Sequence, residues 1–558
     1  MTKRELNIAN LIIVAVCFLV YGNTLNNDYS LDDNYVIVDN PIVEKGVKGI
    51  PQIFKSHYVN RDIEKHSYRP VTLTSFAIEY QFFEANPTIG HLVNLLLYTI
   101  TCILLLRLLL RLFKSYHWML AALATFIFLI LPVHSEAVNN IKSRDELLCL
   151  LFALSALFQF VKYADRKKWY SLAFGIILMA LSLLSKASSI TFLAIIPLTL
   201  YFFTDIKWKR LLVAMTVICV ALLMVKLGSM RVTGPIESVR ESMFHENPFY
   251  ENGTSHLNRI PMGFYTILIY LGLLTFPKDL ICYYGYNQVE IVGWGDPLFW
   301  VSAIVVFTIA VWCIYKFRSK SPIIFGALFF LITISMFANV AKPVVGIIGE
   351  RFTYVPSVGF AIAIACIILK FVKYPLRKED SKSYFGLIFI GIIGVVFISC
   401  SLKIVTRNLD WKDNLTLMRH DIKLAPDSAK LHALIGGTLF HQIKVESIGQ
   451  KRLNMTVEAI NHYKNAVDIY KEYYTSWNNM GTLYFNELKD YKSAKNCYEM
   501  AVSIKPDYPT SLYSLGYCYE LEGDFDLAIS SYKRVIEIDP EYTAAKIHLR
   551  NLLLTRSN

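Results

Sequence analysis

Long apolar runs separated by short polar segments occupy the first part of the chain, whereas the last 150 or so residues show ordinary amphipathic patterning. A run of about 20 apolar residues is long enough to cross a bilayer as a helix. The first run ends at Tyr21-Gly22-Asn23-Thr24, a poor cleavage site, so we interpret it as an anchor rather than a signal peptide. The pattern predicts eleven membrane spans, at 8–22, 90–112, 117–133, 146–164, 169–185, 187–204, 209–228, 297–316, 321–340, 353–373 and 384–403.

A further apolar stretch, 262–276, is short and lies between Pro261 and Pro277. If this stretch does not cross, Lys and Arg are about twice as frequent in the segments on the N-terminal side of the membrane as in the short segments opposite. A crossing here would reverse every later span and place the basic segment 370–382 outside, against the positive-inside rule. We therefore expect 262–276 to be re-entrant or to lie along the surface. The N-terminus is then cytoplasmic and the C-terminal tail is outside.

Composition agrees with a membrane protein. Of the 558 residues, 54% are hydrophobic and 18% are charged, and the mean hydropathy is +0.40. The net charge of +12 comes largely from Lys and Arg beside apolar runs, so topology explains it better than a nucleic-acid partner. The ten cysteines form no CxxC pair and no metal-ligand spacing, and we interpret them as packing residues. No nucleotide-binding GxxxxGK[ST], and no GxGxxG after a strand, is present.

The C-terminal region contains a repeat with a period of 34–35 residues. Ala459, Ala494 and Ala528 recur in register, as do Tyr463, Tyr498 and Tyr532. Gly437, Gly481 and Gly516 mark the first helix of each unit. Trp477-x-x-Met480-Gly481-x-x-Tyr484 resembles the tetratricopeptide pattern, in which antiparallel helix pairs stack and bind proteins or peptides in a concave groove. A rigid spacer is the alternative. We expect an all-α chain with a polytopic helical bundle at 1–404 and about three repeats plus a capping helix at 405–558.

Four groups of polar residues are unusual for a purely structural bundle, and all lie on the external side under this topology. The first three have structural alternatives: a capped turn for the first, an interfacial anchor for the second, and a salt-bridge cluster for the third. Lys186, in a tight external turn, is an added candidate for phosphate contact. The groups are Asp32-Asp33 in the first external loop (23–89); His66, Tyr68 and Arg69 with His91 and Asn94; His134 and Glu136 with Lys142, Arg144, Asp145 and Glu146; and Glu350, Arg351 and Tyr354.

In this order the motifs resemble the transmembrane and tetratricopeptide repeat-containing O-mannosyltransferases over nearly the whole chain. The matching segments are Asp32-Asp33, Tyr68-Arg69-Pro70-Val71-Thr72, His91-Leu92-Val93-Asn94, Pro132-Val133-His134-Ser135-Glu136, Arg144-x-Glu146-Leu147-Leu148 and Glu350-Arg351-x-x-Tyr354-x-Pro356-Ser357. Around Lys186 the sequence departs from the animal members, which read Lys-Glu-Gln-Gly. That departure and the small number of repeats are expected of a distant member, including a bacterial one.

The resemblance implies a GT-C-type bundle that transfers a sugar, mannose in the family, from a polyprenyl- or dolichyl-phosphate donor to protein hydroxyls. Asp32 would be the general base and Asp33 its neighbour. We expect the donor phosphate near Arg69, Arg144, Lys186 or Arg351, where cations would stabilise the leaving group. The supporting residues would be His66, Tyr68, His91, Asn94, His134, Glu136, Asp145, Glu146, Glu350 and Tyr354.

The sequence leaves several alternatives open. We expect no cofactor and no metal, although a divalent ion beside Asp32-Asp33 is compatible with the residues. A transporter of lipid-linked intermediates and a non-catalytic scaffold are the competing functions. Charges at the external ends of spans, rather than at their centres, argue against the first, and the number of spans argues against the second. The membrane is either a bacterial plasma membrane or the endoplasmic reticulum, with the repeats outside or in the lumen.

Overall fold

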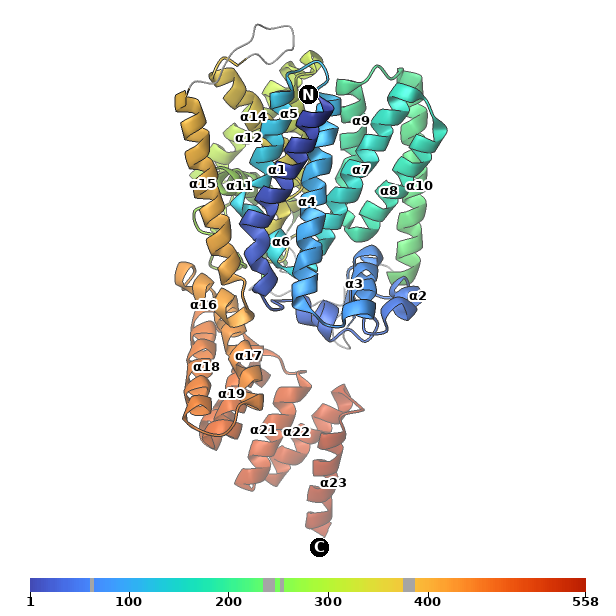
Figure 1. The fold of residues 1–558 in the computed structure, drawn as a ribbon. Helices are drawn as coiled ribbons and strands as arrows, with labels where there is room; N and C mark the ends of the chain where they lie inside the picture. Colours follow the sequence, from blue (N-terminus) through green and yellow to red (C-terminus); the bar gives the residue numbers. More distant parts are fainter. Residues whose placement is uncertain (61–64, 234–245, 251–254, 375–386, 558) are drawn as a thin grey trace. The chain divides into compact units, whose positions relative to one another are not determined.

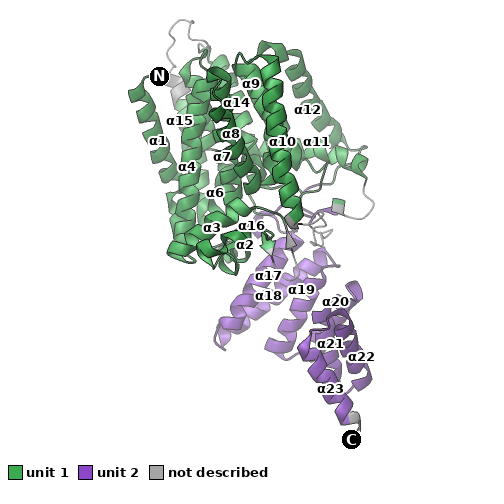
Figure 2. Ribbon diagram, turned by 90° about the vertical axis from the view of Figure 1, so that its right-hand side faces the viewer, with its two compact units in different colours: residues 1–242, 249–282, 291–417 green, residues 243–248, 283–290, 418–558 purple. Residues whose placement is uncertain are grey.

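The computed structural model describes all residues except 61–64, 234–245, 251–254, 375–386 and 558. By contact, the chain forms two compact units (Figure 2). Unit 1 comprises residues 1–242, 249–282 and 291–417, and unit 2 comprises 243–248, 283–290 and 418–558. The domain boundary expected at 404/405 falls inside the last long helix of unit 1, which continues to Asp410.

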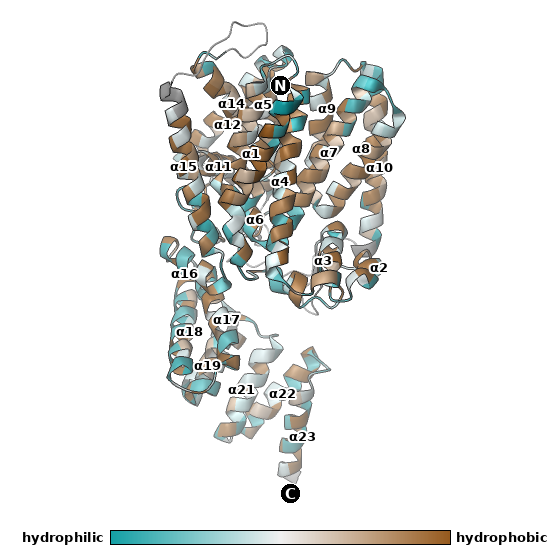
Figure 3. Cartoon of the chain, viewed as in Figure 1, coloured by the Kyte–Doolittle hydropathy of each residue, from teal (hydrophilic) through white to brown (hydrophobic). Residues whose placement is uncertain are grey.

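Unit 1 is a bundle of apolar helices (Figure 1). The hydropathy colouring in Figure 3 shows brown, apolar stretches along most of these helices, whereas the helices of unit 2 are mixed. The helices of the bundle are α1 (Lys3–Tyr21), α4 (Pro87–Leu112), α5 (Trp118–Leu129), α6 (Ser135–Asn139), α7 (Arg144–Arg166), α8 (Trp169–Ser185), α9 (Phe192–Phe203), α10 (Trp208–Thr233), α11 (His256–Thr275), α12 (Pro297–Tyr315), α13 (Pro322–Ile334), α14 (Ser357–Phe371) and α15 (Leu387–Asp410).

A helix is present at each of the eleven predicted spans. Within the described residues, seven helices are long and apolar enough to cross a bilayer, or eight if one bent pair counts as a single span. Four shorter apolar helices match predicted spans as well: Trp169–Ser185, Ala187–Phe203, Pro322–Phe337 and Ser357–Phe371. The predicted all-α membrane bundle followed by helical repeats is confirmed.

The stretch 262–276 is longer than the sequence pattern suggested. Helix α11 begins at His256 and continues through Pro261, so it has 20 residues and passes the same test of length and composition as six others. Pro261 lies inside this helix and cannot donate to the Leu257 carbonyl oxygen, yet the helix continues through it. The expectation of a short segment is wrong. Its path relative to the membrane, argued from charge, stays a prediction.

The predicted span 117–133 is bent near its end. Helix α5 ends at Leu129, and the segment Pro132–Asn139 continues at 55° to it. Pro132 disfavours helical dihedrals at the residue before it, and Leu131 is extended with ψ of 116°. This bend turns α6 and the following residues across the end of the bundle, where most of the candidate site residues lie.

The loop 23–89, predicted to be external, lies at the same end of the bundle. It contains α2 (Ile50–Ile53), α3 (Pro70–Phe83) and the short antiparallel pair β1 (Val59–Asn60) and β2 (Lys65–His66). Figure 1 shows α2, α3 and α6 at the end opposite to the N-terminus. Helix α15 ends nearby, because the Asn408 side-chain amide donates to the Val20 carbonyl oxygen at 2.8 Å and the Asp28 N–H donates to the Lys412 carbonyl oxygen at 2.8 Å.

Unit 2 is built from antiparallel helix pairs. The helix α16 (Asn414–Leu424) joins it to unit 1 along the chain. Its repeat helices are α17 (Ala429–Val445), α18 (Gln450–Ile469), α19 (Tyr474–Leu483), α20 (Tyr491–Ile504), α21 (Pro509–Glu522), α22 (Phe525–Ile538) and α23 (Thr543–Ser557). Two segments from earlier in the chain belong to the same unit. Glu246 pairs with Lys430 at 3.4 Å, and the Tyr286 and Tyr470 rings lie 5.6 Å apart. Neither hydropathy nor the repeat period predicts that residues 243–248 and 283–290 join the repeat unit.

In the first repeat, the glycine that packs against the tyrosine ring is Gly436, one position before the predicted Gly437. In the second and third repeats, Gly481 and Gly516 face the rings of Tyr498 and Tyr532, where an added Cβ would lie 2.9 and 3.0 Å from the ring. The equivalent contact in the first repeat is made by Gly436, whose added Cβ would lie 2.9 Å from the Tyr463 ring, and not by Gly437. Adjacent glycines cannot be distinguished by sequence spacing in a repeat that also carries an insertion.

This difference predicts opposite effects for two neighbouring substitutions. Gly436→Ala is expected to destabilise the first repeat by about 1–3 kcal/mol, because the methyl group would overlap the Tyr463 ring. Gly437→Ala is expected to stabilise it by about 0.5–1 kcal/mol, because its Cβ would meet only the Tyr463 hydroxyl, at 3.8 Å, and alanine is the better helix former. Rates of limited proteolysis between residues 429 and 469 in the full chain measure both. Equal effects of the two variants would contradict this packing.

Candidate active site

The tandem aspartates lie in a tight turn of the first external loop. The Asp33 N–H donates to the Ser30 carbonyl oxygen at 3.1 Å, and the Ser30 N–H donates back to Asp33 Oδ2 at 2.9 Å. Leu31 adopts a left-handed conformation with φ of +51°, and its N–H donates to Asn414 Oδ1 at 2.6 Å. This turn directs the two neighbouring carboxylates to different surroundings.

Asp33 is the buried member of the pair. Its side chain is fully buried, and Oδ1 accepts the backbone N–H of Lys142 at 2.6 Å. Burial raises the pKa of Asp33 to about 7, although the backbone N–H groups of Ser30 and Lys142 favour the carboxylate. Asp33 therefore attaches the first loop to the segment between α6 and α7, and it offers no surface to a substrate.

Asp32 is the exposed member of the pair. Its side chain is 58% exposed, and Oδ2 lies 2.8 Å from Lys142 Nζ. Lys142 is in the short 3₁₀ turn η5 (Ile141–Ser143), and its carbonyl oxygen accepts the Tyr58 hydroxyl at 3.2 Å. One residue thus contacts both aspartates, Asp33 through its backbone and Asp32 through its ammonium group. Of the tandem pair, Asp32 is the carboxylate that can meet an incoming hydroxyl.

Three predicted phosphate-binding residues come together beside this pair, each next to a buried carboxylate. Arg69 Nη1 pairs with Asp145, Lys186 Nζ pairs with Glu146 and lies 3.8 Å from Asp145, and Arg351 Nη1 pairs with Glu136. The Arg351 N–H also donates to Glu136 Oε2 at 2.8 Å. We call Arg69, Lys142, Lys186 and Arg351 the basic cluster.

Four separate elements supply the basic cluster. Arg69 precedes α3, Lys142 lies in η5, Lys186 follows α8 and Arg351 lies in the turn η10 (Glu350–Thr353). All four act electrostatically on Asp145, which begins α7 together with Glu146. The cations of the cluster are 9–22% exposed, whereas Glu136, Asp145 and Glu146 are at most 2% exposed. Arg69, Lys186 and Arg351 are thus each more exposed than their carboxylate partners, although Lys186 is itself largely buried.

The basic cluster and Asp32 are coupled. Burial lowers the pKa of Arg351, but Glu136 and then Asp32 and Asp145 raise it, with a net increase. Arg69 lies over the Tyr58 ring, 4.6 Å from its centre, and Tyr58 in turn contacts Lys142. Arg69, Lys186 and Arg351 thus gather around Asp145, and Arg351 also interacts electrostatically with Asp32. Their role as phosphate ligands stays a prediction.

Arg144 is placed differently from the other predicted phosphate ligands. It is fully buried, with Nη2 2.8 Å from Glu79 Oε2 and Nε donating to Asn94 Oδ1 at 2.9 Å. Its guanidinium also lies over the Phe76 ring, 4.4 Å from the centre. A phosphate cannot reach it without opening this packing, so we do not retain Arg144 as a phosphate ligand. Glu79, its partner on the buried face of α3, was not identified from the sequence.

Several predicted supporting residues have structural contacts. The Asn94 amide lies 3.3–3.4 Å from the carbonyl oxygens of Val138, Asn140 and Ile141, which fixes the segment leading to Lys142. The Tyr68 hydroxyl donates to the Phe54 carbonyl oxygen at 3.0 Å, and His91 Nε2 lies 3.4 Å from the Asp28 carbonyl oxygen. His66 forms part of β2, and its side chain lies outside the described residues.

His134, Glu350 and Tyr354 are buried inside the bundle. His134 Nδ1 lies 3.0 Å from the Tyr98 hydroxyl and Nε2 lies 2.9 Å from Ser357 Oγ, so the ring bridges α4 and α14. The Tyr354 ring is 5.0 Å from the His134 ring, and the Glu350 side chain is fully buried. His134, Glu350 and Tyr354 are therefore buried neighbours of Glu136 and Arg351 along the chain. They do not line the basic cluster.

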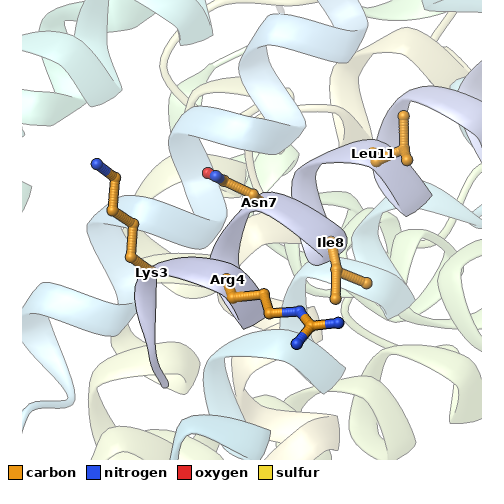
Figure 4. A pocket seen from close by; sticks show the side chains of 5 residues that line it. All are labelled: Lys3, Arg4, Asn7, Ile8 and Leu11. Atoms are coloured by element: carbon orange, nitrogen blue, oxygen red, sulfur yellow. The ribbon is translucent and has the colours of Figure 1, made fainter.

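No metal-binding group is evident in the described part of the chain, where no three His, Cys, Asp or Glu side chains lie together as ligands. Metal independence stays a prediction. A hollow of about 510 Å³ lies at the start of α1, lined by Lys3, Arg4, Asn7, Ile8 and Leu11 (Figure 4). It contains none of the predicted site residues. We attribute its basic lining to the flank of a membrane span.

Comparison with known proteins matches tetratricopeptide repeat models to residues 474–508 and 509–542. The protein O-mannosyl-transferase F38B6.6 of Caenorhabditis elegans is 28% identical over 84% of this chain and 64% of its own length. The human protein O-mannosyl-transferase TMTC3 is 23% identical over 97% of this chain and 62% of its own length. The chain is a distant homologue of the TMTC proteins. It spans somewhat less than two thirds of the length of these relatives.

The homology covers both units of the chain. A tetratricopeptide domain of RPAP3 bound to an HSP90 peptide is 22% identical over 23% of this TMTC homologue and 94% of that domain, with a TM-score of 0.21. The family models confirm two of the predicted repeats, the second and the third. The predicted resemblance to the TMTC family is confirmed by relatives in nematode, fly, amphibian and mammals.

Proposed function

We propose that this protein is a membrane glycosyltransferase that moves mannose from a polyprenyl- or dolichyl-phosphate donor to Ser or Thr hydroxyls of protein acceptors. The observation that carries the proposal is the exposed Asp32 carboxylate beside the partly exposed basic cluster. A general base and a cationic site for the leaving phosphate are the two groups this reaction needs. The names of the homologues support the same activity.

The proposed reaction uses these groups in one displacement. Asp32 takes the proton of the acceptor hydroxyl as its oxygen attacks the anomeric carbon. The bond from that carbon to the phosphate oxygen breaks, and its electron pair remains on the phosphate. Arg69, Lys186 and Arg351 face the negative charge that develops there, and the buried Glu136, Asp145 and Glu146 hold them in place. Under this proposal Arg and Lys supply the positive charge, and no metal is required.

The repeats are proposed to bind the protein acceptor on the same side of the membrane as Asp32. Support comes from the chain path within unit 1, where α15 ends beside the start of the first external loop through Asn408 and Lys412. The polypeptide therefore leaves the bundle at the end that carries the basic cluster. By charge bias this is the extracytoplasmic side, in either a plasma membrane or the endoplasmic reticulum.

Sugar transfer by the full chain in lipid nanodiscs tests the proposal. Polyprenyl-phosphate mannose, polyprenyl-phosphate glucose and a nucleotide-linked mannose serve as donors, with a Ser/Thr peptide and its Ala-substituted control as acceptors. We expect mannose on the hydroxyl peptide only, from the lipid-linked donor only, and unchanged transfer in EDTA. Absence of transfer from every lipid-linked donor would contradict the proposal. Movement of lipid-linked sugar between leaflets without transfer would favour a transporter.

A further inference from the structure

Lys142 makes three polar contacts and lies between the tandem aspartates and the other cations of the basic cluster. Its ammonium group pairs with Asp32 at 2.8 Å, its N–H donates to Asp33 Oδ1 at 2.6 Å, and its carbonyl oxygen accepts the Tyr58 hydroxyl at 3.2 Å. Two backbone bonds fix the main chain, whereas the side chain is held by the ion pair. The ammonium group can therefore change partners without any movement of the loop.

The ion pair of Lys142 differs from the other three in the cluster. The carboxylate partners of Arg69, Lys186 and Arg351 are at most 2% exposed, so these carboxylates are fixed inside the protein. The partner of Lys142 is Asp32, which is 58% exposed. Asp32 is also the carboxylate that the proposed reaction protonates. Of the four pairs in the basic cluster, this is the one in which catalysis would remove a charge.

We propose that Lys142 is a phosphate-binding residue that exchanges partners during the reaction, pairing with Asp32 before transfer and with the departing lipid phosphate afterwards. This inference rests on the proposed function. When Asp32 receives the acceptor proton, its negative charge is lost and its attraction for the ammonium group falls. In the same step the breaking bond leaves one more negative charge on the phosphate. A charge-assisted bond from Lys142 to the phosphate then replaces the one to Asp32.

The exchange gives Lys142 two effects that a structural lysine would lack. Before transfer it favours the ionised form of Asp32, which is the form that can act as a base. After transfer it adds a fourth cation to the three that already face the phosphate. Asp32 and the lipid phosphate therefore compete for the same ammonium group. Neutralising Asp32 should strengthen phosphate binding, and it should do so only when Lys142 is present.

A double-mutant cycle on lipid-phosphate binding tests this competition without relying on turnover. The full chain in nanodiscs is titrated with a short-chain polyprenyl phosphate, using the wild type, Asp32→Asn, Lys142→Met and the double variant. We expect Asp32→Asn to bind about five- to tenfold more tightly and Lys142→Met about five- to tenfold more weakly than wild type. The double variant should match Lys142→Met within about twofold. Lys142→Arg should retain most of the affinity.

Controls separate this role from a loss of structure. Lys45→Met removes an exposed lysine of the loop that carries Asp32, which contacts Gln52, and should leave phosphate affinity unchanged. The inference is overturned if Asp32→Asn does not tighten binding, or if the tightening persists without Lys142. If the wild type transfers mannose but the cycle shows no coupling, the inference fails alone. If the coupling is present but no sugar is transferred, the proposed function fails and Lys142 remains a phosphate ligand.

Discussion

Replacing Asp32 by asparagine is expected to lower the rate of sugar transfer by about 10²- to 10⁴-fold, because an amide of nearly the same shape cannot take the acceptor proton. The loop should keep its conformation, since bonds of Asp33, Ser30 and the Leu31 N–H fix the turn and the amide keeps the shape of the Asp32 side chain. The loss should therefore appear in kcat, with KM for the lipid-linked donor little changed or lowered. Initial rates of mannose transfer from polyprenyl-phosphate mannose to a Ser/Thr peptide measure it.

Asp39→Asn is the matched control for this variant. Asp39 is an exposed aspartate of the same external loop, outside the turn that carries Asp32, and its replacement should change the rate by less than about twofold. Asp33→Asn provides a second comparison. It replaces one of the two oxygens that accept the backbone N–H groups of Ser30 and Lys142 by an NH2 donor, and it should disturb the loop as well as the rate. Transfer at the wild-type rate by folded Asp32→Asn would remove Asp32 from the role of base.

Much of the architecture could be predicted because the bilayer imposes one simple pattern. A membrane span must be helical and about 20 residues long, so apolar runs locate helices directly. The repeat register was readable because small and aromatic residues recur at a fixed period. The pattern failed where local chemistry intervened. Pro132 bends one predicted span. Pro261 suggests the start of an apolar segment in the sequence, but helix α11 continues through it.

The convergence of the candidate site could be predicted from topology, but its pairings could not. Alternating spans place every second loop on one side, which brought the motifs around Asp32, Arg69 and Arg351 together. Topology does not say which cation faces which carboxylate, because that depends on side-chain directions within a few ångströms. Lys142 was noted among external charges but was not assigned a role, although it contacts both Asp32 and Asp33.

Arg144 shows most clearly that the sequence does not reveal which carboxylate a cation faces. It stands beside Asp145 and Glu146 in one motif, and sequence alone gives all three the same environment. The first turn of α7 separates them: Asp145 and Glu146 face Arg69 and Lys186, while Arg144 points to Glu79 on α3. Residues one position apart on a helix point about 100° apart, so neighbours in a motif need not share a site.

Replacing Arg144 by methionine is expected to destabilise the protein by about 3–5 kcal/mol, because it leaves the Glu79 carboxylate buried without its cation. Asn94 Oδ1 would also lose the hydrogen bond that it accepts from the Arg144 guanidinium. Asn94 in turn holds the segment leading to Lys142. The midpoint of thermal unfolding in detergent should fall clearly. Replacing Arg144 and Glu79 together by methionine should recover at least half of the loss, since no unpaired charge remains.

The same variants decide between a structural and a phosphate-binding Arg144. Arg318→Met, at an exposed arginine between α12 and α13, is the control and should leave the unfolding midpoint unchanged. Folded Arg144→Met, assayed at low temperature, should bind a short-chain polyprenyl phosphate within about twofold of wild type, because the guanidinium lies behind the packed surface. A tenfold loss of phosphate affinity with an unchanged midpoint would reverse this assignment. Arg144 would then join Arg69, Lys186 and Arg351 as a ligand of the donor.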